Sequence, residues 1–462
     1  MDGKRFKSKI KLSTPQIITL GFAGVIFVGG LLLWLPWATV EGEYTSFTDA
    51  MFTSTTSVCV TGLVTQVTAT HWTLFGKIVI LGLIQVGGLG IVSLVSLVFI
   101  TVRKKINLKS RRIIQETYNQ DHLSGMVVMV KRIAKGVFIA EGLGAVLYAF
   151  TFVPRYGVAR GIWYSVFHSV SAFCNAGIDI LGPDSLSSYV ENVPVNLITM
   201  LLIITGGIGF IVWWDLGKNI RKVYRREITL RNLWKNLQLH SKLVLNMTAI
   251  LLVAGMVFIL IFEYDNPETI GTLTPGGKVL ASAFQSVTTR TAGFLTIDQA
   301  GLRDQSVLVS LLLMFIGGSP MGTAGGIKTT TIAVLILTVN AYLRGKQDVE
   351  VYHRKLRELQ VRAAIAVSMI SFAVLIIVVI VLSVMMPHAD FVDITYELTS
   401  ALGTVGLSRG MTPALNTAGK WLVIFSMYFG RIGPITLVTA MFLKSNKRPG
   451  NVRLAEGRVL IG

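Results

Sequence analysis

The sequence predicts an all-α polytopic membrane protein in which one unit of two spans and a re-entrant loop occurs four times. Of its 462 residues, 52% are hydrophobic and 15% are charged, whereas a soluble domain carries about 25% charged residues. The apolar residues lie in long blocks, most of them near the roughly 20 residues that cross the hydrocarbon core of a bilayer. A short polar turn that ends in glycine recurs four times at almost constant spacing.

The apolar blocks mark the predicted spans. The first follows a basic N-terminus and ends in Leu35-Pro36-Trp37 without the small residues of a cleavage site, so we expect a retained span and not a signal peptide. In chain order the clearest blocks are Ile17–Trp37, Phe75–Val102, Val195–Trp214, Leu243–Phe262, Val307–Ile316, Ile327–Leu343, Ala363–Met386 and Trp421–Leu443.

The net charge of +19 comes from Lys and Arg residues whose positions along the chain indicate the membrane topology. Of 43 Lys and Arg residues, 33 lie in five patches, at residues 1–15, 101–135, 215–242, 344–362 and 444–462. The segments between these patches, on the other side of each pair of spans, carry mostly acids. Basic loops that alternate with acidic loops follow the positive-inside rule, so we expect both termini in the cytoplasm. The same distribution argues against nucleic-acid binding and favours contact with anionic lipid.

Four segments of one kind define the repeats. Each runs from an aromatic residue through small and polar residues to a glycine, and the four are Phe52–Gly62, Phe167–Gly177, Phe284–Gly293 and Tyr396–Gly406. The glycines are 115, 116 and 113 residues apart, close to a quarter of the chain. Each segment must enter and leave from the external face, because the flanking spans have their other ends in basic patches. Irregular backbone at membrane depth requires protein or a wet cavity around it, so four such loops predict a central pore.

This period predicts how the chain is divided. We expect a basic cytoplasmic N-terminus (1–15), repeat one (16–102), a cytoplasmic loop (103–126), repeat two (127–217), a loop (218–241), repeat three with a broken second span (242–343), a loop (344–361), repeat four (362–443) and a cytoplasmic tail (444–462). The prediction is therefore about eight transmembrane helices and four re-entrant pore helices.

A cation that sheds its water needs oxygen ligands, and rings of backbone carbonyls supply them. Glycine adopts the unusual backbone angles of such a ring at little steric cost. The four glycines and the residues before them are therefore the candidate filter: Val60, Thr61 and Gly62; Asn175, Ala176 and Gly177; Thr291, Ala292 and Gly293; Thr404, Val405 and Gly406. The C-terminal dipole ends of the preceding helices also favour a cation.

These motifs, together with Phe429-Gly430-Arg431-Ile432-Gly433-Pro434, resemble the Trk/Ktr/HKT cation transporters over nearly the whole chain, and most closely the bacterial Ktr translocating membrane subunit (KtrB type). The resemblance implies K⁺ uptake that Na⁺ often stimulates, K⁺ bound by carbonyls at the four glycines, and no organic cofactor. It also implies a homodimer in the bacterial plasma membrane, seated on a cytosolic RCK-type ring that binds ATP or ADP.

Some positions depart from the K⁺-channel pattern. K⁺ channels place a second glycine two residues after the first, where this chain has Val64, Asp179, Leu295 and Ser408. The carbonyl ladder should therefore be shorter and its selectivity less stringent. In plant relatives a serine in the first loop accompanies Na⁺ transport, so Gly62 favours K⁺. The third loop is one residue shorter than the others.

The second span of each repeat carries a glycine motif, and the third copy predicts a gate. Gly87-Gly88-Leu89-Gly90 and Gly206-Gly207-Ile208-Gly209 are explained by close helix packing. The third span instead contains five glycines and a proline within fifteen residues, which will not remain helical. Its candidate gating residues are Gly317, Gly318, Ser319, Pro320, Gly322, Thr323, Gly325, Gly326 and Lys328. The alternative is a kink used for packing.

Arg431 occupies the slot that glycine fills in the other three motifs. A charged residue inside a span is a functional candidate, and a positive charge below a cation filter opposes permeation. Arg431 could also pair with an acid or with carbonyls of the broken span, and both roles are compatible if it latches the loop. We expect Lys328 to reach the cytoplasmic face, Arg290 to brace the external filter backbone, and Cys59 and Cys174 to be buried packing residues.

Three other classes of protein could contain repeated apolar spans of this kind. A secondary transporter with inverted repeats requires two halves of opposite topology, whereas all four loops here lie on one side. A membrane enzyme requires a cluster of acid, base or nucleophile residues, which the sequence does not contain, so we expect no enzyme. A Na⁺-conducting member of the same family remains the alternative.

Overall fold

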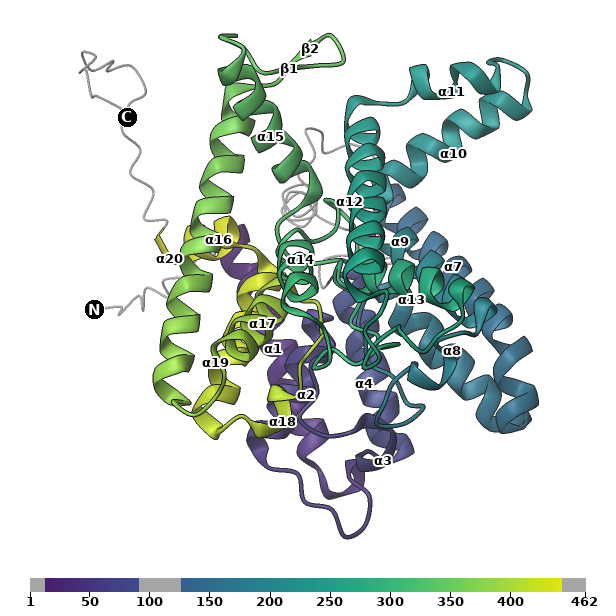
Figure 1. Ribbon diagram of the computed structural model, residues 1–462, viewed down its shortest axis with the longest axis vertical. Helices are drawn as coiled ribbons and strands as arrows, with labels where there is room; N and C mark the ends of the chain where they lie inside the picture. Colours follow the sequence, from purple (N-terminus) through teal and green to yellow (C-terminus); the bar gives the residue numbers. More distant parts are fainter. Residues whose placement is uncertain (1–12, 91–125, 443–462) are drawn as a thin grey trace, which may run out of the picture.

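The computed structural model describes residues 13–90 and 126–442. The predicted N-terminal basic segment up to residue 12, the end of the first repeat at 91–102, the loop from 103 to 125 and the cytoplasmic tail lie outside the described residues. In the described part the protein is almost entirely helical (Figure 1).

Four helices are long enough and apolar enough to cross a membrane: α1 (Thr14–Trp34), α7 (Met126–Tyr156), α12 (Leu239–Glu263) and α16 (Glu358–Met385). Two bent helix pairs raise the number to six among the described residues. Ser13 begins α1 with a capping box to Gln16. The exposed side chains of α16 include Met369, Phe372 and Ile380, which suit an acyl-chain environment. The chain is therefore an all-α, multi-pass membrane protein.

A shorter helix follows each long one: α2 (Phe47–Cys59), α8 (Val158–Cys174), α13 (Pro275–Thr288) and α17 (Phe391–Gly403). These helices lie inside the bundle although they are rich in Ser and Thr. Some hydroxyls are satisfied within the helix, as where Thr55 donates to Met51 O (2.7 Å). Others donate to a neighbouring helix, as where Ser54 donates to Ile26 O (2.7 Å). Buried polar groups are tolerated when they are hydrogen-bonded in this way.

A further helix leads back across the molecule in each quarter of the chain: α4 (Leu74–Leu89), α9 (Val193–Gly207), α14 (Asp304–Phe315) and α19 (Thr417–Ile432). The remaining elements connect or extend these: η1 (Pro36–Ala38), α3 (Thr68–His71), η2 (Ser187–Tyr189), α10 (Phe210–Tyr224), α11 (Leu230–Asn236), α15 (Thr329–Leu343), α18 (Met411–Ala414) and α20 (Pro434–Phe442).

The predicted break in the third span is present between α14 and α15, but the prediction of a single broken span was incomplete. The α9–α10 pair bends by 101° and the α19–α20 pair by 100°. The residue at each bend, Gly209 or Gly433, has a φ near +90° that side chains rarely adopt. Gly90, after α4, has almost the same backbone angles. The last glycine of the motif therefore ends the helix, a role that close helix packing alone does not explain.

The packing function of the first glycine of the motif is also visible. A methyl group added to Gly87, Gly206 or Gly430 would collide with the carbonyl oxygen of Val58, Phe173 or Leu402, respectively. Each of these oxygens lies near the C-terminal end of a short buried helix. The second helices are thus held against the ends of the short helices.

One small exception to the all-α prediction lies between α15 and α16. Strands β1 (Glu350–Val351) and β2 (Arg354–Lys355) pair antiparallel through Glu350↔Lys355 and Val351↔Arg354. Tyr352 and His353, which join them, both have positive φ, as a two-residue type I′ turn requires. The hairpin lies at one end of the bundle above α15 and α16 (Figure 1).

Candidate functional site

The four short buried helices lead into turns with one backbone pattern. Two residues before each candidate glycine the backbone is left-handed, with φ of 52° at Val60, 59° at Asn175, 71° at Thr291 and 52° at Thr404. The glycines themselves have φ of 102° at Gly62, 65° at Gly177, 80° at Gly293 and 98° at Gly406. The repeated pattern means that the same unusual turn is built four times, although the third loop is shorter.

The four glycines meet at one place and form a closed ring. A methyl group on Gly62 would lie 2.8 Å from the carbonyl oxygen of Ala176, one on Gly177 2.5 Å from that of Ala292, and one on Gly293 2.5 Å from that of Val405. A methyl group on Gly406 would collide with the carbonyl oxygen of Thr61, which returns to the first loop. Each glycine thus faces the residue before the next glycine in cyclic order. The structure brings all twelve predicted filter residues together.

A hydroxyl in each short helix holds the ring segment, which the sequence analysis missed. Gly62 N donates to Thr56 Oγ1 (2.9 Å), and Gly406 N donates to Ser400 Oγ (3.0 Å). In the other two loops the hydroxyl donates instead, from Ser171 to Ile178 O (2.6 Å) and from Thr288 to Phe294 O (2.8 Å). The signal was available: a Ser or Thr stands six residues before three of the glycines, and five before the glycine of the shorter third loop.

A cavity of about 300 Å³ opens onto one side of the ring. Its lining includes the four glycines together with Asp179, Asp298 and Ser408. Asp179 lies in the loop after α8 and accepts a hydrogen bond from Leu181 N (3.2 Å). Burial raises the pKa of Asp179 to about 6, although hydrogen bonds to Ser185 and to backbone amides oppose this.

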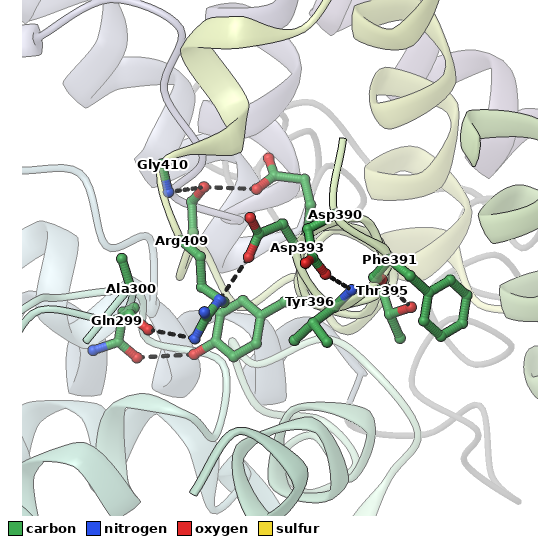
Figure 2. A network of polar contacts seen from close by, with 12 residues as sticks. Gln299, Ala300, Asp390, Phe391, Asp393, Thr395, Tyr396, Arg409 and Gly410 are labelled. Carbon is green, nitrogen blue, oxygen red and sulfur yellow. Dashed lines mark hydrogen bonds and ion pairs between the residues drawn. The ribbon is translucent and has the colours of Figure 1, made fainter. Parts of the chain in front are cut away.

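The third and fourth loops are tied together beside this cavity (Figure 2). Arg409 forms an ion pair with Asp393 (2.7 Å) and donates to Gln299 O (3.0 Å). Tyr396 donates to Gln299 Oε1 (2.8 Å). These contacts join the segment after the fourth glycine to α17 and to the third loop, and so restrain the ring.

Glu397 of α17 holds the segment that follows the fourth glycine. It is fully buried in α17, and its carboxylate accepts hydrogen bonds from Ser408 Oγ (2.7 Å) and Thr412 Oγ1 (2.5 Å). Ser408 stands two residues after Gly406, and both hydroxyls belong to the chain that leaves the ring. The buried acid therefore fixes that segment against the helix.

The candidate gating loop, residues 317–326, lies on the other side of the ring. Its ends are adjacent, because Ile316 and Ile327 form a parallel bridge and Thr329 N donates to Gly318 O (3.0 Å). Its tip contacts the second loop, where Thr323 Oγ1 donates to Asn175 Oδ1 (3.0 Å). A methyl group on Gly325 would collide with the Thr404 side chain. The loop is thus in contact with two of the four left-handed residues of the ring.

The loop is also docked on the helix pair α9–α10. Ser319 N donates to Gly207 O (2.9 Å), and Thr323 N donates to Gly206 O (3.1 Å). A methyl group on Gly209 would collide with Pro320 O, so the bend at this glycine makes room for the loop. Beyond the loop lies a cavity of about 400 Å³ lined by Pro320, Met321 and residues of α12, α15 and α16.

Arg431 bridges this loop to a different quarter of the protein. Its guanidinium donates to Thr323 O at the tip of the loop and to Gly87 O in α4 (2.5 Å). Among the described residues no carboxylate lies within ion-pair distance of it. Of the two partners considered from the sequence, an acid or the carbonyls of the broken span, the structure places Arg431 on the carbonyls.

Two expectations about basic side chains were wrong. Lys328 does not reach toward the cytoplasmic face, because its amine turns back and donates to Ala324 O (2.7 Å) and Gly325 O (3.4 Å) of the loop. Arg290 does not brace the external filter backbone. Its buried guanidinium donates to Gly317 O (3.2 Å), where the loop begins. In both cases the backbone carbonyls freed by the broken helix are acceptors that the sequence pattern does not position.

Cys59 and Cys174 are buried and not disulfide-bonded, in agreement with the packing role expected for them. Cys174 Sγ lies 3.7 Å from an oxygen of Glu141, which also accepts a hydrogen bond from Gln85 (3.0 Å). Glu141 is a buried acid inside α7 that the sequence analysis did not single out. The signal was a single acidic residue within an otherwise apolar stretch of that helix.

The chain has extensive similarity to known transport proteins. The TrkH family model, described as a cation transport protein, matches residues 9–448. The potassium/sodium uptake protein NtpJ of Enterococcus hirae is 39% identical, with 98% of both chains covered. The Ktr system potassium uptake protein B of Bacillus subtilis is 40% identical, again with 98% of both covered. The protein of the same name in Vibrio alginolyticus is 36% identical, with 100% of this chain and 97% of that protein covered.

A solved structure has a similar fold. The potassium transporter TrkH from Vibrio parahaemolyticus superposes with a TM-score of 0.74, covering 96% of this chain and 88% of its own. The sequence identity is 19%, so this similarity concerns the fold alone.

Proposed function

Because the chain belongs to the TrkH family of cation transport proteins, we propose that it conducts K⁺ across the membrane through a pore at the centre of four repeats. The observation that carries this proposal is the closed ring of Gly62, Gly177, Gly293 and Gly406. The similarity to proteins named for potassium uptake supports K⁺ as the ion.

In this proposal each repeat contributes a first span, a re-entrant pore helix and a second span. The first spans are α1, α7, α12 and α16, and the pore helices are α2, α8, α13 and α17. The second spans begin with α4, α9, α14 and α19. Those of the second and fourth repeats bend, and that of the third is broken, below the ring. Both termini and the basic loops face the cytoplasm, as the distribution of Lys and Arg indicates.

The filter would consist of carbonyl oxygens at the four glycines and at the residues before them. In each segment a residue of negative φ stands between two of positive φ, and this alternation allows successive carbonyls to turn toward a common axis. The C-terminal ends of the pore helices add partial negative charge near that axis. Together these features replace the water that K⁺ loses on entry and leave no titratable group inside the ring.

K⁺ selectivity should depend on the width of the ring. A methyl group added to any of the four glycines would lie closer than van der Waals distance to a carbonyl oxygen of the neighbouring loop. The ring therefore has no room for a side chain. Na⁺ conduction is the second candidate, because the relative from Enterococcus hirae is named a potassium/sodium uptake protein. Gly62 in the first loop favours K⁺ over that alternative.

Below the filter, the loop 317–326 and Arg431 would form the gate. The loop contacts Asn175 and Thr404 of the ring, and Arg431 holds its tip. The neighbouring 400 Å³ cavity provides space into which the loop can move. In the closed state the path would be blocked by the loop and by a positive charge, both of which oppose a cation.

We also propose that the chain acts within a larger assembly in the bacterial plasma membrane. The relatives named as protein B of a Ktr system support a multi-component transporter. The expected partners are a second copy of the chain and a cytosolic RCK-type ring that binds ATP or ADP. Na⁺ would act as an activator, with K⁺ as the transported ion.

Complementation tests the proposal directly. The chain is expressed in cells that lack their K⁺ uptake systems, with and without a Ktr regulatory subunit, at low external K⁺ and with or without Na⁺. Growth and ⁸⁶Rb⁺ uptake are expected to return, most strongly with the regulatory subunit and Na⁺. If Na⁺ enters and K⁺ does not, the Na⁺ alternative is correct; no ion uptake in any condition would contradict both.

A further inference from the structure

We propose that Arg290 couples the selectivity filter to the gate, by fastening the neck of loop 317–326 to the third filter segment. This inference rests on the filter and gate roles proposed above. It assigns to Arg290 a positioning role that joins two structures otherwise separated in the chain.

Arg290 belongs to the filter segment and also contacts the loop 317–326. Its backbone lies in the turn after α13, three residues before Gly293 and directly before the left-handed Thr291. Its side chain leaves this segment and reaches Gly317 O, the first carbonyl of the loop, at 3.2 Å. One residue is therefore covalently part of the filter segment and hydrogen-bonded to the gate.

Gly317 is the neck of the loop and not its tip. A methyl group on Gly317 would collide with Gly325 O and would lie 3.0 Å from Gly326 Cα, so the two ends of the loop touch at this residue. The Ile316↔Ile327 bridge closes the same neck one residue away. Arg431 holds a separate point, Thr323 at the tip. The loop is consequently fixed at two places, by one arginine from the filter and by another from the fourth second span.

Because Arg290 is charged, breaking its hydrogen bond to Gly317 O would be energetically costly. The side chain is buried, and no carboxylate of the described residues lies within ion-pair distance. Its Nε has no hydrogen-bond partner within residues 13–90 and 126–442. A buried cation that loses its remaining acceptor is strongly destabilised. The tip can therefore swing away only if the neck remains on Arg290, or if Arg290 and the filter segment shift with it.

A joint movement of Arg290, the filter segment and the loop would connect the gate to the filter. Ala292 O lies in the ring against Gly177, so movement of the segment 290–293 changes the cage in which K⁺ is held. Binding of K⁺ in the filter should then stabilise the position of the segment, and with it the position of the neck. By thermodynamic reciprocity, the state of the loop alters the affinity of the filter for K⁺ to the same degree.

The test measures opening of the loop and its dependence on K⁺. Ser319→Cys is introduced into the buried loop, and its modification by a membrane-impermeant maleimide from the cytoplasmic side is timed in K⁺ and in Na⁺. The protein with its two buried native cysteines is the blank. In otherwise wild-type protein, the labelling rates in the two ions are expected to differ by about fivefold, at the low end of usual couplings between sites.

Three variants in this background distinguish the possibilities. Arg290→Gln and Arg290→Lys are expected to abolish the difference between K⁺ and Na⁺, and Arg290→Gln also to lower the K⁺/Na⁺ uptake ratio. Arg290→Lys keeps the charge and so remains informative if Arg290→Gln does not accumulate in the membrane. Arg431→Ala is expected to speed labelling in both ions and to retain the difference. Exposed Arg160→Gln is the matched control and should behave as wild type.

The outcomes separate this inference from the proposed function. If either Arg290 variant keeps the full K⁺ dependence of labelling, Arg290 does not couple filter and gate. If Arg431→Ala changes neither labelling nor uptake, the gate itself is wrong. Loss of K⁺ dependence in the Arg290 variants with retention in Arg431→Ala supports the coupling.

Discussion

The guanidinium of Arg431 donates a hydrogen bond to the carbonyl oxygen of Thr323, at the tip of the loop that interrupts the third second span. The other side of the same guanidinium binds Gly87 in α4. A residue from the last quarter of the chain therefore holds a segment of the third quarter against a helix of the first. This arrangement makes Arg431 the point at which the proposed gate can be released.

Replacing Arg431 with alanine should increase K⁺ uptake. A hydrogen bond to a charged group contributes about 1.5–3 kcal/mol, so its loss should shift the loop toward the open position about tenfold. ⁸⁶Rb⁺ uptake at matched protein level measures the effect. Arg431→Lys retains the charge but cannot bridge two carbonyls as a planar fork does, and an intermediate rate is expected. Unchanged or slower uptake in Arg431→Ala would contradict the latch.

Substitution of Gly62 by serine should reduce discrimination against Na⁺. The residue has φ of 102°, and its new Cβ would lie 2.8 Å from Ala176 O. The left-handed backbone alone costs a non-glycine residue about 1–2 kcal/mol, so we expect the K⁺/Na⁺ uptake ratio to fall about tenfold. Gly82→Ala in α4 is the control, because a methyl group there meets nothing within 4 Å. An unchanged ratio in Gly62→Ser would argue against a filter at this ring.

Glu397→Gln should weaken K⁺ binding in the filter. Glutamine offers one acceptor oxygen where the carboxylate offers two, so either Ser408 or Thr412 loses its partner. An unsatisfied buried group costs about 1–3 kcal/mol, and we expect the KM for K⁺ to rise about tenfold with a smaller change in the maximal rate. Glu358→Gln, at an exposed acid paired with Arg362, should leave both parameters unchanged. A lower maximal rate with unchanged KM would place the effect outside the filter.

The sequence was sufficient for features that repeat along the chain. The spacing of Gly62, Gly177, Gly293 and Gly406 identified the ring, because each position combines a positive φ with a carbonyl oxygen of the next loop that leaves no room for a Cβ. Three of the four long helices, α1, α12 and α16, were equally clear, since lipid demands about 20 apolar residues whatever the neighbours are. The fourth, α7, was not among the apolar blocks and was implied only by the repeat, because basic residues at its start and Glu141 interrupt its apolar sequence. The break of the third span followed from its glycines and proline alone.

Features that depend on contacts between repeats could not be obtained in this way. Arg290 and Lys328 bind backbone carbonyls, and every residue has a carbonyl, so no sequence pattern marks the acceptor. Gly209 and Gly433 were interpreted as packing residues. A glycine in the sequence can mark either close helix packing or a bend with positive φ, and the sequence does not distinguish the two. Glu141 meets Gln85 and Cys174 from other helices, which only the assembled bundle brings together.

Uptake should also depend on external pH through Asp179, which lines the cavity outside the ring. Burial raises the pKa of this carboxyl to about 6, so it is charged above that pH and neutral below it. A negative charge at the entrance concentrates cations, and uptake is therefore expected to fall as the external pH decreases through about 6.

Asp179→Asn removes the charge at every pH. In that variant uptake at pH 7.5, measured as ⁸⁶Rb⁺ influx, should match the low-pH rate of the wild type and should no longer change between pH 7.5 and 5, a range that spans the shifted pKa. Asp265→Asn, at an exposed acid that does not line the cavity, should keep the wild-type pH profile. If Asp179→Asn keeps that profile too, another group at the entrance is titrating and Asp179 does not set the local cation concentration.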